Sequence, residues 1–340
     1  MSAVPVAILE TGLVTSVGLS APAACAAIRA GVANPTETLF MDSAGEWIRA
    51  HQVPLQRPWR GLARLVEMGA LAIEECLAPV PREDWSRIPL LLCVAESQRP
   101  GRLSGLDTDL FAQLQRKLQV EFAQGSLIIA HGRISVGIAL REARDLIVNK
   151  GFPRALIAGV DSLLTAPTLR AYERDERLLT AANANGFMPG EGAGAILVGP
   201  VMQRPQLVCA GLGFGTEPAP IDSDEPLRGD GLVRAIKAAL GEAECELHHL
   251  DFRITDLSGE QYYFKEAALA LSRVLRARKS EFELWHPAEY VGESGAASGL
   301  ASLVVAEAAC RKDYARGPNI LWHSAADNGY RAAAVLQART

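Results

Sequence analysis

Short apolar runs, bounded by glycine or polar residues, alternate with longer helical patterns along most of the chain. The runs predict strands at residues 6–9, 90–95, 127–130, 155–158, 195–198, 207–210, 252–257, 319–323 and 332–336. The longer patterns predict helices at residues 21–30, 62–77, 135–149, 232–240 and 263–278, and a glycine-rich turn with its helix at residues 292–310. Strands that alternate with helices in this way are typical of an α/β protein.

The order of strand, loop and helix begins again after residue 200. Residues 200–205 resemble a hinge, and the run at 207–210 then enters a glycine-rich segment much as the run at 6–9 does. We therefore predict a duplicated architecture, with an N-terminal unit of residues 1–200 and a C-terminal unit of residues 201–340. A chain of 340 residues is long enough to bury a large core in two such units.

Residues 126–160 have the layout of a catalytic elbow. An apolar run leads into a tight turn at His131 and Gly132, and a helical pattern follows from about Ser135. A nucleophile at such a turn lies at the positive end of the helix dipole, which lowers the pKa of a thiol. The turn, however, carries Ile134 and Ser135 where a cysteine is expected.

Composition and charge exclude several classes of function. The net charge is -5 and no run of basic residues occurs, so nucleic acid is not an expected partner. The N-terminal stretch lacks the charged region that begins a secretory signal, and no apolar segment is long enough to span a bilayer. We therefore expect a cytoplasmic protein that has no membrane partner.

The six cysteines and six histidines show no spacing typical of a metal site. No CxxC pair occurs, and most cysteines lie in apolar patterns. Cys93 lies inside a strand-like run, where burial raises the pKa of a thiol and suppresses its reactivity. These observations predict reduced structural thiols, no metal and no cofactor.

Four segments in the same order resemble the β-ketoacyl-acyl carrier protein synthases of the thiolase superfamily. They are residues 11–18 (TGLVTSVG), 155–160 (ALIAGV), 186–194 (GFMPGEGAG) and 291–299 (VGESGAASG). The alternating glycines of the third segment permit positive φ angles and a close approach of the backbone. The resemblance implies the thiolase fold, a duplicated αβαβα sandwich of five layers.

The same resemblance implies that the chemistry of the family is missing. Family members use a cysteine thiolate as the acyl acceptor and two histidines that assist decarboxylation and stabilise the oxyanion. Carried over onto this chain, the cysteine position falls on Ile134, the first histidine position on Leu257, give or take two residues, and the second on Glu293. The gating loop of the family falls at residues 324–329, which contain no phenylalanine, and the segment between residues 179 and 186 is shortened. The resemblance therefore implies vacated catalytic positions and a trimmed acyl tunnel.

Ser135 has two alternative roles. It could replace the missing nucleophile, with His131 as the nearest base in the sequence. The alternative, which we favour, is that Ser135 caps the following helix and that His131 is structural.

Asp256, Glu260 and Glu293 also have two alternative roles, because carboxylates here replace the imidazoles of the family. Clustered carboxylates repel one another, so one of them could acquire a raised pKa and serve as an acid or base. The alternative, which we favour, is that Glu293 bonds to backbone amides of the following helix or pairs with Arg133 across the former pocket.

The resulting functional hypothesis is a catalytically degenerate synthase relative that serves as a non-catalytic partner, accessory or scaffold protein. It would resemble a chain-length factor or an accessory of secretion effectors. Expected partners are a second copy or a synthase-like subunit, since the family dimerises through its first half. An acyl carrier protein, docked on the arginines at positions 57, 60, 64, 99 and 102, or a secretion effector are further candidates. The alternative hypothesis is an acyltransferase or decarboxylase that acts on acyl carrier protein or acyl-CoA thioesters with Ser135 or the carboxylates.

Overall fold

The computed structural model describes residues 4–339, and within them ten strands form one continuous sheet. The strands are β1 (Val6–Val14), β4 (Leu90–Cys93), β5 (Leu127–Ile129), β6 (Ala155–Ser162), β7 (Glu191–Pro200), β8 (Gln206–Thr216), β9 (Phe252–Thr255), β10 (Leu284–Trp285), β11 (Asn319–Ala325) and β12 (Tyr330–Arg339). Residues 1–3, which begin the stretch tested above for a secretory signal, and residue 340 lie outside the described residues.

The strand order repeats between the two halves of the sheet. One half runs β5–β4–β6–β7–β1 and the other runs β10–β9–β11–β12–β8. In each half the first three strands are parallel to one another, the fourth is antiparallel to the third, and the fifth is antiparallel to the fourth. The halves join where residues 6–8 of β1 pair with residues 207–209 of β8. The predicted duplication is therefore confirmed, while the boundary between residues 200 and 201, which falls between β7 and β8, stays a prediction.

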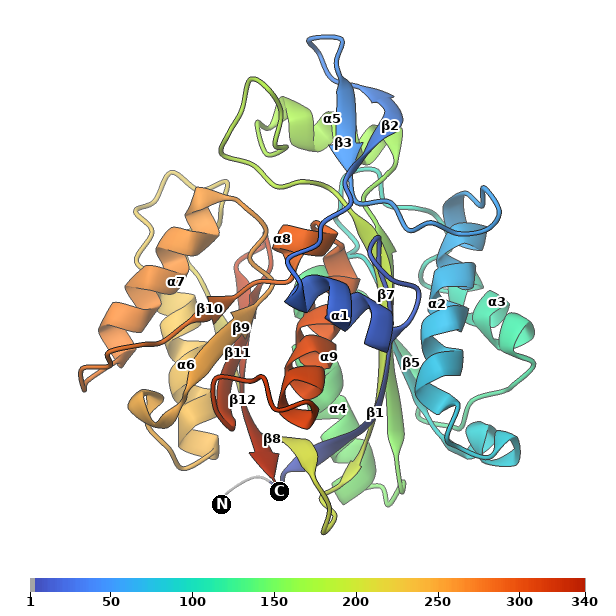
Figure 1. Cartoon of the computed structure of the whole chain (residues 1–340), viewed down its shortest axis with the longest axis vertical. Helices are drawn as coiled ribbons and strands as arrows, with labels where there is room; N and C mark the ends of the chain where they lie inside the picture. The colour runs from blue at the N-terminus through green and yellow to red at the C-terminus, as the bar shows by residue number, and fades with distance from the viewer. Residues whose placement is uncertain (1–3, 340) are drawn as a thin grey trace.

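The helices form three layers around the two halves of the sheet. Helices α2 (Gly61–Leu77) and α3 (Asp109–Leu118) cover the outer face of one half, and α6 (Asp230–Glu242) and α7 (Gln261–Val274) cover the outer face of the other (Figure 1). Helices α1 (Ala21–Arg29), α4 (Ser135–Val148) and α9 (Ser298–Arg311) lie between the two halves. This arrangement confirms the predicted αβαβα sandwich of five layers.

The central layer is packed without room for larger side chains at its glycines. The indole of Trp322 is fully buried between α4 and α9. A Cβ at Gly299 would lie 3.3 Å from Trp322 Cζ2, and a Cβ at Gly137 would lie 2.8 Å from the Cβ of Ala332. These glycines allow the helices to approach the sheet closely, which fixes the position of the turns that begin α4 and α9.

Several elements differ from the sequence prediction. The strands β2 (Thr36–Met41) and β3 (Trp47–Ala50) form a separate two-stranded sheet, and α3, α5 (Ala166–Arg174), α8 (Ala288–Val291) and the short β10 were not predicted. The predicted helix at 263–278 ends at Val274 because Leu275 is extended. No helix in the described part of the chain is long and apolar enough to cross a membrane.

Candidate functional site

Two equivalent turns lead into the central helices. The turn η2 (Gly132–Ile134) precedes α4, and η4 (Gly295–Ala297) precedes α9. Gly132 has φ 55° and Gly295 has φ 54°, a left-handed conformation that favours glycine. A Cβ at these positions would overlap the carboxylate oxygens of Glu96 and Asp161, respectively. The repeated turn therefore needs glycine both for its backbone angle and for the carboxylate packed against it.

The Ser135 hydroxyl makes both of its hydrogen bonds to the segment before α4. It accepts a hydrogen bond from the His131 amide at 3.1 Å and donates one to the Ile129 carbonyl at 3.1 Å, and Ser135 is fully buried. The prediction that Ser135 caps α4 is wrong in detail, because its bonds go to residues that precede the helix and Ile134 occupies the N-cap position. Ser298 makes the matching contact in the second half, accepting the Ser294 amide at 3.2 Å.

The His131 ring lies against Tyr330 in the lining of a cavity. Its side chain is exposed and packs edge-on against Tyr330, with 6.4 Å between the ring centroids. No hydrogen bond joins the His131 ring to Ser135 in residues 4–339. The geometry therefore offers no nucleophile–base pair at this turn.

We expect Ser135→Ala to lower the free energy of unfolding by about 1–2 kcal/mol, because it leaves the His131 amide without its partner and removes one of the two hydrogen bonds to the Ile129 carbonyl, which still accepts the Val94 amide. Urea unfolding followed by circular dichroism measures this change. Ser272→Ala removes a hydroxyl from an exposed position and is the matched control, with an expected change within about 0.5 kcal/mol. Equal stability of the two variants would show that the turn does not depend on the hydroxyl.

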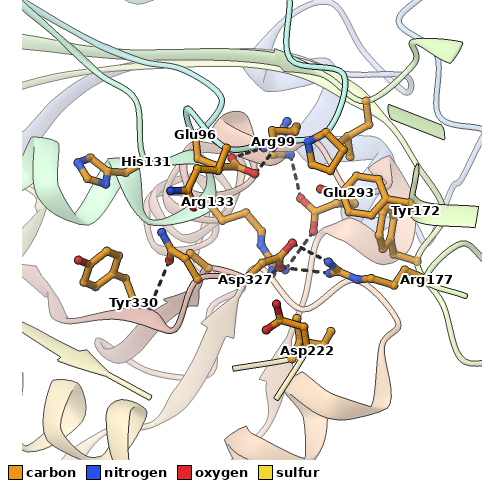
Figure 2. A pocket seen from close by; sticks show the side chains of 18 of the residues that line it. Glu96, Arg99, His131, Arg133, Tyr172, Arg177, Asp222, Glu293, Asp327 and Tyr330 are labelled. Carbon is orange, nitrogen blue, oxygen red and sulfur yellow. Dashed lines mark hydrogen bonds and ion pairs between the residues drawn. The ribbon is translucent and has the colours of Figure 1, made fainter. Parts of the chain in front are cut away.

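A cavity of about 550 Å³ lies beside the two turns, between the halves of the molecule. Its titratable lining consists of Glu96, Arg99, His131, Arg133, Tyr172, Asp175, Arg177, Asp222, Glu260, Glu293, Asp327 and Tyr330. Figure 2 shows that the charged side chains converge from both halves onto its centre. The described lining contains no cysteine and no lysine.

Arg133, which follows Gly132 in the first turn, is the centre of a buried charge network. Its Nη2 lies 2.7 Å from Asp327 Oδ1, its Nη1 lies 3.4 Å from Glu293 Oε2, and its Nε lies 4.0 Å from Asp256 Oδ2. The guanidinium also lies 4.3 Å from the centroid of the Tyr263 ring. Arg133 from the first half thus binds three carboxylates from the second half.

Arg177 makes a second bridge between the halves. Its Nε and Nη2 donate to Glu260 at 2.7 and 2.9 Å, and its Nη1 donates to Asp327 at 2.7 Å. The Tyr263 hydroxyl also donates to Asp327. Burial alone would raise the pKa of Asp327, but Arg133 and Arg177 hold it well below its usual range. Asp327 therefore carries its charge in the turn where the resemblance placed a gating loop.

Arg99 fills the space between the two glycine turns. It donates to both oxygens of Glu96, at 2.9 and 2.7 Å, and to Asp161 Oδ2 at 2.6 Å. Asp161 also accepts the Ala296 amide at the start of the second turn, at 2.9 Å. The prediction that Arg99 and Arg64 belong to an exposed docking surface is therefore wrong. Arg99 is buried, and Arg64 donates to the buried Glu191.

The predicted carboxylates have three different environments. Glu293 pairs with Arg133, one of the two contacts expected for it, and its backbone partner is the Gly295 amide at 2.8 Å, in the turn before α9 and not in the helix itself. Burial raises the pKa of Glu293, although Arg133 opposes the shift. Glu260 lines the cavity and forms an ion pair with Arg177. Asp256 is not part of the lining and accepts the Ser324 hydroxyl at 2.6 Å. Arginines thus separate carboxylates that were expected to repel one another.

The remaining predicted positions lie in apolar packing. Ile134 is buried in the central core, and Leu257 is buried in the outer core of the second half beside Tyr263. Leu257 therefore does not face the charge network, although its neighbour Asp256 does. Cys93 is fully buried, and burial raises the pKa of its thiol. No group of three or more metal-ligating side chains in residues 4–339 has the geometry to hold an ion.

Sequence reasoning missed Arg177, Asp327, Tyr263 and the inward position of Arg99. Asp327 and Arg133 are 194 residues apart, so no local pattern connects them. The usable signal was weak: charged residues occur where the resembling family has catalytic or gating residues, and their partners are visible only in three dimensions.

No protein-family model matches the sequence, and no curated protein matches it. Solved structures match it over nearly its whole length. The ishigamide ketosynthase/chain length factor has a TM-score of 0.79 and 17% identity, covering 99% of this chain and 100% of that chain. The AntDE:AntF complex of a type II acyl-carrier protein with its ketosynthase has a TM-score of 0.80 and 15% identity, covering 99% and 100%.

A third match is the ketosynthase ApeO in complex with its chain length factor ApeC from Xenorhabdus doucetiae, with a TM-score of 0.76 and 13% identity over 98% of each chain. Together with the duplicated sheet and the five layers, these matches show that the chain has the thiolase-type fold of ketosynthases and chain length factors.

Proposed function

We propose that this chain is a catalytically inactive ketosynthase-like subunit that acts as a partner or scaffold. The observation that carries the proposal is the arginine–carboxylate network, in which Arg133 and Arg177 bind Glu293, Glu260 and Asp327 beside the elbow turn. Each of these side chains forms an ion pair with another member of the network, so the cluster is structural. Acyl transfer would instead require a free nucleophile at this place.

The state of Ser135 supports the same proposal. Its proton is donated to the Ile129 carbonyl and its lone pair accepts the His131 amide, so a nucleophilic role would require breaking the turn. Ile134, at the position carried over from the family cysteine, points into the central core. The elbow therefore supports the fold and offers no acyl acceptor.

A subunit of this kind needs a partner, and the edge of the sheet offers a surface for one. The strand β5 lies at one end of the sheet, without a neighbour on its outer side in residues 4–339, and Leu127 on it is 37% exposed. An unpaired edge strand is a template for a strand of another chain. Two of the structural matches are complexes or pairs of a ketosynthase with a chain length factor. We propose pairing through this first half, with a second copy or with an active synthase-like subunit.

The proposal is tested by incubating the purified protein with malonyl and acyl thioesters of coenzyme A and of an acyl carrier protein, followed by intact mass and product analysis. We expect no covalent adduct and no decarboxylation. An acyl adduct that disappears in Ser135→Ala, or turnover by the wild type, would overturn the proposal. A parallel affinity purification from the native host, with sedimentation analysis of the isolated chain, distinguishes a synthase-like partner from a second copy.

A further inference from the structure

The hairpin of β2 and β3 presents an apolar face to solvent. Leu39, Met41 and Trp47 are 81%, 52% and 46% exposed, and Leu39 is the most exposed large apolar side chain in residues 4–339. Figure 1 shows the hairpin beside α5, apart from the ten-stranded sheet. Large apolar side chains that gather on one exposed face mark an interaction surface.

The other face of the hairpin is anchored in the molecule. Ile48 is buried in a small core with Leu169 and Phe187, and Phe40 packs against the same core. Successive side chains of a strand point to opposite faces, so the exposed side chains that alternate with the buried ones share the outward face. That face carries Glu37, Leu39, Met41, Trp47 and Arg49.

Hydrogen bonds fix the turn that joins the two strands. Asp42 Oδ1 accepts the amides of Ala44 and Glu46 at 3.0 and 2.9 Å, and the Asp42 amide donates to the Glu46 carbonyl at 2.8 Å. The Ser43 amide donates to the Glu173 carboxylate of α5. The outward face is therefore preformed, and a partner would bind it at a small cost in conformational entropy.

The strand register makes this face complementary to itself. Glu37 lies directly opposite Arg49 across the two strands. Both side chains are exposed, and neither forms an ion pair within residues 4–339. Towards the turn, Met41 lies opposite Trp47. When two such faces pack together about a two-fold axis parallel to the strands, each residue lies over the cross-strand neighbour of its equivalent in the second copy. Glu37 then faces Arg49 of the second copy, and the methionine faces the indole, on both sides of the axis.

We propose that the outward face of the hairpin binds the same face of a second copy of this chain, about a two-fold axis parallel to β2 and β3. Opposite charges and apolar side chains at matched cross-strand positions suit a second copy, whereas an unrelated partner would need no such match. Five side chains per copy are far fewer than the roughly 20–30 residues on each side of a stable interface, so we expect a weak association with a Kd on the order of 10–100 µM. This surface is not the β5 edge, and the inference does not depend on the proposed inactive-subunit role.

Sedimentation velocity of the full chain at about 1–500 µM tests the inference, and we expect the mass of the wild type to rise with concentration. Glu37→Arg weakens the association at least tenfold, because it brings arginines of the two copies together on both sides of the axis. Arg49→Glu has the same effect with carboxylates. An equimolar mixture of these two variants associates again, because opposite charges then face each other between the copies although each hairpin carries charges of one sign. The double variant Glu37→Arg with Arg49→Glu restores the wild-type affinity to within about threefold.

Leu39→Ser weakens the association about tenfold by removing the most exposed apolar side chain of the face. Met202→Ser, at a side chain that is 43% exposed outside the hairpin, is the matched control and leaves the association unchanged. Thermal melts of all variants are expected to stay close to that of the wild type. A wild type that stays monomeric, single charge variants that associate like the wild type, or a mixture that associates no better than its components would overturn the inference. None of these outcomes bears on the inactive-subunit proposal, which depends on acyl adducts in a separate assay, and an assembly insensitive to the hairpin variants would leave pairing through β5 intact.

Discussion

Arg331→Ala is expected to lower the free energy of unfolding by about 3–5 kcal/mol, because it leaves the carboxylate of Glu266 buried without its counter-charge. The two side chains are 0% and 1% exposed, and Arg331 Nε lies 2.8 and 2.9 Å from the carboxylate oxygens. Arg331 Nη1 also donates to the carbonyls of Ala326 and Tyr330, at 2.6 and 2.9 Å. These bonds hold the turn that carries Asp327, so the loss extends to the cavity.

Urea unfolding with linear extrapolation measures this effect. Arg316→Ala is the matched control, since Arg316 and its partner Glu283 are 61% and 38% exposed, and its expected cost is within about 1 kcal/mol. The double variant Arg331→Met with Glu266→Leu should recover most of the loss, because apolar residues of similar volume often replace a buried pair without cost. A loss in Arg331→Ala no larger than that in Arg316→Ala would contradict the prediction.

The strand and helix pattern of the fold was predictable because its signals are local. Apolar runs located the central helices and part of each long strand, although β1 and β8 continue past the predicted runs to Val14 and Thr216, and the turns at Gly132 and Gly295 fall in segments where turns were predicted. The hairpin of β2 and β3 was missed because its outward face carries apolar residues, with Leu39 81% and Trp47 46% exposed, so the alternation of apolar and polar residues is absent.

The candidate site was predictable only in part. The positions of Glu293 and Arg133 follow from the turns before α9 and α4, and their contact could be anticipated because the two turns are equivalent. The roles of Asp327 and Arg177 could not, because four segments distant in sequence meet there and charge alone does not choose among partners. Leu257 differs from Asp256 by one position, and such an offset decides whether a side chain faces the network or the outer core.

Arg133→Met is expected to lower the free energy of unfolding by about 3–5 kcal/mol near neutral pH, because Glu293, Asp256 and Asp327 lose a shared cation in the interior. Methionine retains much of the volume of the arginine stem, so the loss reports charge more than packing. Arg141→Met, on the exposed face of α4, is the matched control with an expected change within about 1 kcal/mol.

The cost of Arg133→Met should depend on pH. Burial already raises the pKa of Glu293, and removing Arg133, which opposes that shift, raises it further. The folded variant then binds this proton more tightly than the unfolded chain, so its stability falls as pH rises from the ordinary range of a glutamate through the raised folded pKa. Asp327 does not add to a difference between pH 5 and pH 8, because the stability from its depressed folded pKa is lost only as pH falls from its unfolded pKa through the folded one. The deficit relative to wild type should therefore be larger at about pH 8 than at about pH 5, measured by urea unfolding at each pH. A deficit that is equal at both would show that Arg133 stabilises the fold by packing and not by charge.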